Sequence, residues 1–229
     1  MRACRHPPKE PLFGELSLEH IQFVPQSIGV LTEELAEQFR VALPGSRMRL
    51  HANTRVLPNR EISDLAAWET RQPYFRQLAK VSRLLDSPAY TAHAGRRDQA
   101  SLSKVFDAAR RAADLFGVPV GVEGHYPTRD DRWLLSTWEE YAQLLEARAP
   151  YALDLSHLHI LATQTGRVET GLTRDLLESE CAIEIHVSGC DGEADTHDVP
   201  VEAPWWFDLL KHCGPQAVVF SEANHFRFH

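Results

Sequence analysis

Seven short apolar runs recur along this chain, and segments with helical spacing separate them. The runs cover 19–25, 47–53, 89–95, 118–125, 151–157, 181–189 and 217–224. Strands that alternate with helices form βαβ units, which place the strands parallel in one sheet. The sequence therefore predicts an α/β fold, a parallel (β/α) barrel of the TIM type with about seven evident strands.

The segments between these runs carry helix signals. We expect helices over 31–43, roughly 62–85, 101–117, 136–147, a short stretch near 172–179, and 203–214. Pro73 is expected to kink or break the second helix, and Gly117 to end the third. Ser136 with Glu139 three residues later predicts a capping box at the start of the fourth.

The chain length bounds the number of domains. A chain of 229 residues without repeats or a linker suits a single barrel domain over 1–229, with an irregular N-terminal segment over 1–17. A full barrel has eight strands, and only 1–17 could supply the eighth. The sequence also ends soon after Asn224 without a closing helix. We expect a trimmed barrel whose open edge is covered by a small partner protein or by a second copy in a homodimer.

Composition excludes several classes of partner. The formal net charge of -8 argues against nucleic acid, because such proteins usually carry a basic face. No apolar stretch approaches the roughly 20 residues of a membrane span, so we expect no membrane partner. Cys4, Cys181, Cys190 and Cys213 form no C-x-x-C pair and are typical of reduced thiols. The expected location is cytoplasmic.

Residues that can bind metal ions stand at or just beyond the ends of the apolar runs. They are His51, His93, Glu123, Asp154, His157, His186, Asp195, His197 and Glu222. The C-terminal ends of the strands of a parallel barrel meet on one face, so these side chains are expected to converge. Taken singly, each is more often a solvated carboxylate or a hydrogen-bonded histidine. Buried together, they need metal ions to offset their desolvation and mutual repulsion.

With these residues in place, the chain from about Leu18 to Asn224 resembles the xylose isomerase-like TIM-barrel superfamily. Two of its branches order their ligands as His, His, Glu, Asp-x-x-His, His, Asp-x-His, Glu, as the nine residues do here. One branch is the endonuclease IV-type enzymes, which use zinc. The other, the multinuclear non-haem iron-dependent oxidases that modify cysteines in peptides, is closer, because IHVSG followed by DTHDVPVEAPWW resembles its sequences. Gly124, where that family usually has Asn, is a departure.

The resemblance implies two or three metal ions and an assignment of their ligands. The first ion takes His51, His93 and Glu123; the second takes Glu123 as a bridge, Asp154, His186 and Glu222; the third takes His157, Asp195 and His197. Iron is the metal that the oxidase branch implies, although nitrogen and oxygen donors without thiolate suit zinc and manganese equally.

The implied activity is an iron-dependent oxidation of a cysteine or thiol in a peptide or small substrate. The alternatives are a zinc-dependent phosphodiester hydrolase of endonuclease IV type and a sugar isomerase or epimerase. A catalytically idle binding scaffold is disfavoured, because it has little reason to keep so many buried charges.

A few further residues have two interpretations. His125 lies two residues beyond Glu123 and is predicted to act as a catalytic acid or base, against the alternative of a solvated loop histidine. Arg96 and Arg97 follow His93 and could bind an anion, although surface charge is the safer interpretation. Cys190 lies in the loop before Asp195, where an incidental small side chain is the simpler interpretation.

Overall fold

The computed structural model describes residues 7–24, 29–52 and 54–225 of the 229-residue chain. Its centre is a sheet of seven parallel strands, each hydrogen-bonded to the next in sequence order. The strands are β3 (His20–Phe23), β4 (Arg47–His51), β5 (Tyr90–His93), β6 (Val120–Glu123), β7 (Tyr151–Asp154), β8 (Ala182–Val187) and β9 (Val218–Ser221). The predicted parallel barrel is confirmed. Pro25, Asn53 and Cys4, which belong to segments discussed above, lie outside the described residues.

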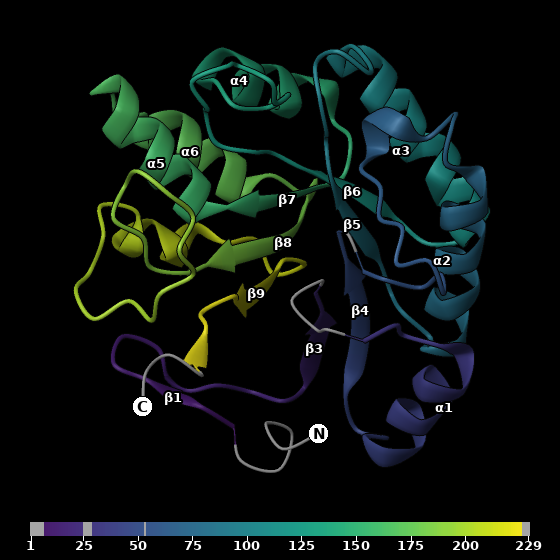
Figure 1. Cartoon of the computed structure of the whole chain (residues 1–229). Coiled ribbons are helices and arrows are strands. Elements are labelled where there is room, and N and C mark those ends of the chain that lie inside the picture. Colours follow the sequence, from purple (N-terminus) through teal and green to yellow (C-terminus); the bar gives the residue numbers. More distant parts are fainter. Residues whose placement is uncertain (1–6, 25–28, 53, 226–229) are drawn as a thin grey trace.

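Helices cover the outer face of this sheet (Figure 1). They are α1 (Glu33–Ala42), α2 (Gln72–Leu84), α3 (Leu102–Phe116), α4 (Trp138–Ala147), α5 (Leu155–Thr165) and α6 (Thr170–Glu178), with short 3₁₀ segments η1 (Leu65–Ala67) and η2 (Phe207–His212). The expected helix over 62–85 is thus split, and Pro73 stands in the first turn of α2, where its missing N–H is tolerated. The expected helix over 203–214 is only the 3₁₀ segment η2. None of the helices in the described ranges is long and apolar enough to cross a bilayer.

The predicted end of α3 is confirmed, and the predicted start of α4 differs from the structure by one residue. Gly117 ends α3 with a φ of 76°, as predicted. The capping box of α4 uses Thr137 and Glu140, not Ser136 and Glu139: the Thr137 side chain accepts from the Glu140 backbone N–H at 3.3 Å. Glu140 returns a bond by accepting from the Ser136 N–H at 3.0 Å. The predicted box was therefore wrong by one position.

The expected strand over 151–157 is wrong in its second half. β7 ends at Asp154, and α5 begins at the next residue. Asp154 caps this helix, because its Oδ1 accepts from the backbone N–H groups of Ser156 at 2.7 Å and His157 at 3.2 Å. The D-x-x-H spacing therefore places His157 in the first turn of a helix at the mouth of the barrel.

Alternation along the strands separates an apolar outer face from a polar interior. Leu50, Val122 and Ile185 belong to the hydrophobic core. Between such residues, the side chains of Arg49 on β4 and Glu184 on β8 meet at 3.0 Å. These strands are not neighbours in the sheet, so both side chains point into the barrel.

The barrel is nearly closed. Within the described residues, β3 and β9 share no hydrogen bonds, and we call the gap between them the seam. The N-terminal segment was expected to be irregular. It contains instead an antiparallel pair of strands, β1 (Lys9–Glu10) and β2 (Gly14–Glu15), outside the barrel sheet. Figure 1 shows β1 beside the seam, and Glu10 accepts hydrogen bonds there from Ser221 and His225. The hairpin thus covers part of the seam; a partner or second copy over the rest stays a prediction.

Candidate metal centre

All nine predicted ligands gather at the C-terminal ends of the strands or in the segments that follow. Seven of them line one cavity of about 130 Å³, together with Val24: His51, His93, Glu123, His157, Asp195, His197 and Glu222. The other two, Asp154 and His186, belong to groups whose ligand atoms lie within 4.8 Å of one another. These groups are His51–Glu123–His186, Glu123–Asp154–His157 and Asp154–His186–Glu222.

Glu123 lies at the centre of the cluster. Its Oε2 is 2.8 Å from Nε2 of His51, and its Oε1 is 3.2 Å from Nδ1 of His186. Burial acts to raise the pKa of Glu123, but the charges of His51, His186 and His93 outweigh it and hold the pKa well below its ordinary value. An ionised carboxylate with both oxygens facing imidazole nitrogens can bridge two ions.

Several polar atoms of the cluster have no hydrogen bond within the described residues. They are Oε2 of Glu123, Oδ2 of Asp154, Oδ1 of Asp195 and Nδ1 of His197, all buried. The 2.8 Å approach of Glu123 to His51 therefore brings two atoms together without a hydrogen bond. Buried polar atoms without partners are rare in proteins. A metal ion can accept lone pairs from several such atoms together, so this donor set fits metal ions. Its nitrogen and oxygen atoms suit iron, zinc or manganese.

The orientation of His157 is set by the backbone of the segment that follows β6. Its Nδ1 lies 2.9 Å from the carbonyl oxygen of Gly124 and donates to it, which leaves Nε2 toward the carboxylates. Nε2 is 3.4 Å from Oδ2 of both Asp154 and Asp195. Burial lowers the pKa of His157, but Asp154 and Asp195 outweigh it and raise the pKa to about 10. Without metal, this imidazole is protonated at neutral pH.

The loop after β8 supplies the outer candidate ligands, Asp195 and His197. Gly189 and Asp198 exchange backbone hydrogen bonds of 2.7 and 2.8 Å, which close the loop between them. Asp195 then stands between two imidazoles, with Oδ2 at 3.1 Å from Nε2 of His197 and 3.4 Å from Nε2 of His157. These three residues are the ones assigned to a third ion by the resemblance.

His93 fits its implied assignment less closely than the others do. Its Nε2 is 3.6 Å from Glu123, and its Nδ1 is 3.5 Å from Asp64, a residue that the sequence patterns did not single out. The tightest group around His51 contains His186 instead of His93. Asp64 precedes η1, and no spacing signal marks it; only the packing of that loop against the end of β5 brings it to His93.

His125 lies beside the cluster and outside the wall of its cavity. Its ring stacks on Trp133 with centroids 4.3 Å apart and lies 4.4 Å from the ring of His93. Burial, then the charges of His93 and His157, hold the pKa of His125 well below its ordinary value, so its imidazole is neutral. Its buried Nε2 has no hydrogen-bond partner within the described ranges. A catalytic role for this residue stays a prediction.

The remaining candidates have structural partners. Arg96 pairs with Asp98, and Arg97 pairs with Glu140 at the start of α4, so both are ion-paired surface residues. Cys190 directs its thiol toward the carbonyl of Ser156 at 3.8 Å. Burial raises the pKa of Cys190 to about 11, and the thiol is therefore protonated and a poor metal ligand.

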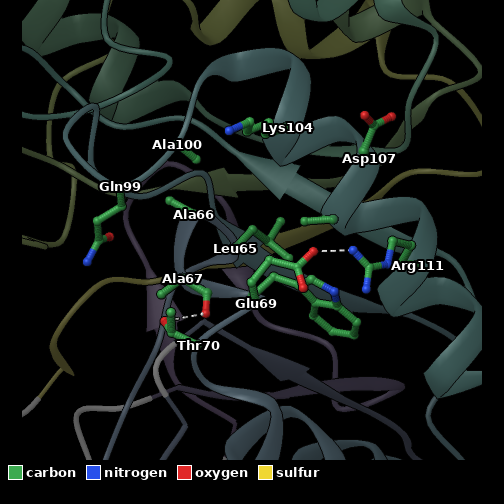
Figure 2. A pocket seen from close by; sticks show the side chains of 12 residues that line it. Leu65, Ala66, Ala67, Glu69, Thr70, Gln99, Ala100, Lys104, Asp107 and Arg111 are labelled. Atoms are coloured by element: carbon green, nitrogen blue, oxygen red, sulfur yellow. Dashed lines mark hydrogen bonds and ion pairs between the residues drawn. The ribbon is translucent and has the colours of Figure 1, made fainter.

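A larger hollow, of about 550 Å³, lies between η1 and α3 on the helical exterior. Figure 2 shows alanine side chains along it and Glu69 and Arg111 pointing toward one another as an ion pair. None of the potential metal-binding groups among the described residues lies here. Volume alone does not make this hollow a candidate for catalysis.

Known proteins match this chain in fold and not in sequence. No family model matches it, and no curated protein matches it. An AP endonuclease, family 2, from Brucella melitensis superposes with a TM-score of 0.59 at 17% identity, covering 90% of this chain and 82% of that one. A D-tagatose 3-epimerase-like protein gives 0.55 at 15%, covering 78% and 70%. The IolI protein, solved with a zinc atom, gives 0.51 at 14%, covering 82% and 71%. The fold is the xylose isomerase-like TIM barrel.

Metal uptake by the metal-free protein is expected to release protons. His157 holds a proton below a pKa of about 10, and His186 has its pKa raised well above its ordinary value, because Glu222 and Glu123 outweigh the effect of burial. The raised pKa of each histidine stabilises the folded metal-free protein fully at a pH below the ordinary pKa of 6.5. This stabilisation is lost as the pH rises through the pKa of that histidine in the folded protein. Apparent metal affinity should therefore rise by up to about tenfold per pH unit for each proton displaced. Titration calorimetry at pH 7 in buffers of different ionisation enthalpy measures the release; identical heats in all buffers contradict it.

Proposed function

We propose that this chain is a multinuclear metal-dependent enzyme, an oxidase that uses iron to oxidise a cysteine or thiol of a peptide or small substrate. The observation that carries the metal-dependent part is the cluster of nine nitrogen and oxygen donors at the barrel mouth, several with no hydrogen-bond partner among the described residues. The oxidase part is supported by the resemblance of the segment from His186 to Trp206 to that family.

The walls of the cavity favour a substrate without a phosphate group. Its lining residues are Val24, histidines and carboxylates, with no lysine or arginine among the described residues. A phosphodiester entering this cavity would meet acidic side chains with only the metal ions to offset its charge. A neutral thiol meets no such repulsion.

Each part of the chain has a role in this proposal. When bound, iron supplies Lewis acidity and the electron transfer that links thiol oxidation to dioxygen reduction. Glu123 would hold two ions at once, because its two oxygens face the imidazoles of His51 and His186. His125, whose neutral imidazole lies against the ring of His93, is the residue that we propose as the acid or base of the reaction. The cavity of about 130 Å³ has room for the end of a side chain.

A zinc-dependent phosphodiester hydrolase is the second candidate. The superposition on an AP endonuclease and on a zinc-containing protein favours it, as does a donor set that suits zinc. Because an epimerase-like protein also superposes on this chain, sugar isomerase or epimerase activity is a further outcome of the test.

Loading the metal-free chain anaerobically with Fe²⁺ or Zn²⁺ separates these activities. We expect the iron-loaded protein to consume dioxygen when glutathione or short cysteine-containing peptides are added, and the zinc-loaded protein to consume none. Bis(p-nitrophenyl) phosphate and a ketose serve as the competing substrates. If zinc restores phosphodiester cleavage or sugar isomerisation that is indifferent to oxygen, the oxidase proposal is wrong.

A further inference from the structure

A second polar layer lies inside the barrel, directly beneath the ligands. Its centre is the fully buried carboxylate of Glu184 on β8. Oε1 accepts from Nη1 of Arg49 at 3.0 Å, and Oε2 accepts from the hydroxyl of Thr91 at 2.7 Å and from Nε2 of Gln22 at 2.8 Å. None of these residues belongs to the predicted ligand set. Four strands, β3, β4, β5 and β8, therefore meet at one carboxylate.

The contact with Thr91 determines the tautomer of His51. The hydroxyl of Thr91 has a single hydrogen, which it donates in the hydrogen bond to Oε2 of Glu184. Thr91 Oγ1 also lies 2.8 Å from Nδ1 of His51 and can only accept in that contact. Nδ1 of His51 therefore carries the proton, and the lone pair of Nε2 faces Oε2 of Glu123 at 2.8 Å.

The same carboxylate also contacts His186, from the opposite side. Oε2 of Glu184 lies 3.2 Å from Nε2 of His186 and accepts its proton in a hydrogen bond. When a metal ion displaces the proton of Nδ1, the lone pair of that nitrogen faces Oε1 of Glu123 at 3.2 Å and Oε1 of Glu222 at 3.7 Å. The two histidines would thus bind ions through different nitrogens, Nε2 in His51 and Nδ1 in His186.

Gln22 offers a competing arrangement. Its Nε2 is also 3.1 Å from Nε2 of His186. If Gln22 donates there, the proton of His186 stands on Nδ1 and faces Glu123, and that nitrogen cannot bind an ion. The distances favour the first arrangement, because Nε2 of Gln22 lies closer to Oε2 of Glu184, at 2.8 Å, than to Nε2 of His186, at 3.1 Å.

We propose that Glu184 is the positioning residue of this centre: it orients His186 directly, and His51 through Thr91, so that one nitrogen of each points to the ions. The inference rests on the proposed metal site and adds residues that touch no ion. Hydrogen bonds to ligand histidines from such residues fix the ring and its tautomer, and their loss typically weakens metal affinity 10–100-fold.

Thr91→Val and Thr91→Ser form a matched pair for the test. Valine keeps the shape and removes the hydroxyl, whereas serine keeps the hydroxyl. With Zn²⁺ alone as the probe, we expect Thr91→Val to bind zinc roughly 10–100-fold more weakly than the parent, and Thr91→Ser to stay close to the parent. Circular dichroism and thermal unfolding of the metal-free proteins show whether each variant is folded.

Nitrogen-15 spectra of the zinc-loaded parent test the inference without any substitution. The expected spectrum has His51 protonated at Nδ1 and bound through Nε2, and His186 protonated at Nε2 and bound through Nδ1. The reverse assignment for either histidine, or equal affinity of Thr91→Val and the parent, overturns the role of Glu184 while leaving the metal site in place. A parent chain that binds no zinc, iron or manganese overturns the metal site and this inference together.

Discussion

Replacing Glu123 with glutamine is expected to remove at least one metal ion from each chain and to weaken the binding of the rest by more than about 100-fold. Loss of an outer hydrogen bond alone weakens metal binding by roughly 10–100-fold, and Glu123 contacts His51, His93 and His186 directly. The amide of glutamine has one weak acceptor oxygen and no charge, so it cannot bridge two ions. Elemental analysis of protein purified without chelator measures the loss.

The matched control is Glu178→Gln on the exterior. Glu178, the last residue of α6, is about half exposed, pairs with His212 at 2.7 Å and does not belong to the predicted ligand set. The Glu178→Gln substitution removes the same charge as Glu123→Gln and should leave the metal content unchanged. A Glu123→Gln protein that keeps the parent's ions and affinity would show that this carboxylate is not a ligand.

Gly124→Ala is expected to destabilise the fold by about 3 kcal/mol. A Cβ at this position would lie 2.3 Å from the hydroxyl oxygen of Tyr141 and 2.8 Å from the carbonyl oxygen of Leu135. Tyr141 is fully buried and donates to the carbonyl of His125 at 3.2 Å, so it cannot move aside without losing that bond. Displacement of the Gly124 carbonyl would also disturb the orientation of His157.

Gly171→Ala is the matched control for this substitution. Gly171 lies in α6, and a Cβ there would meet nothing within 4 Å, so the change should be neutral or stabilising by up to about 1 kcal/mol. Urea unfolding of the metal-free proteins measures both. Equal stability of Gly124→Ala and the parent contradicts the packing described around Tyr141.

The strands and the ends of the barrel could be predicted well from the sequence, because both depend on local patterns. Strands β4, β5, β6 and β8 each carry a predicted ligand at the end of an apolar run, and their parallel arrangement brings these ends together. The pattern of the sequence was therefore enough to place His51, Glu123 and His186 in one cluster.

Helix α5 was missed for a physical reason. The apolar run around Asp154 continues into the helix, and a buried helix and a buried strand have the same composition over so short a length. The D-x-x-H spacing was interpreted as two metal ligands only. It also matches an N-cap, because Asp154 accepts from the backbone N–H of His157.

The layer beneath the ligands was not predicted, although one signal pointed to it. Glu184 and His186 share a face of β8, which marks Glu184 as a buried carboxylate that needs partners. The partners Arg49, Thr91 and Gln22 come from three other strands, and no spacing in the sequence relates them. Gly124, a departure from the resembled family, is likewise explained only by the packing of Tyr141.

The central claim is that the nine gathered side chains hold metal ions, and anomalous X-ray diffraction from crystals of the protein purified without chelator tests it most directly. Data collected at the iron, zinc and manganese absorption edges locate and identify each ion. The account predicts two or three anomalous peaks, strongest at the iron edge, among the nine side chains: His51, His93, Glu123, Asp154, His157, His186, Asp195, His197 and Glu222. Crystals soaked in Fe²⁺ without oxygen that show no peak within reach of Glu123 would contradict it.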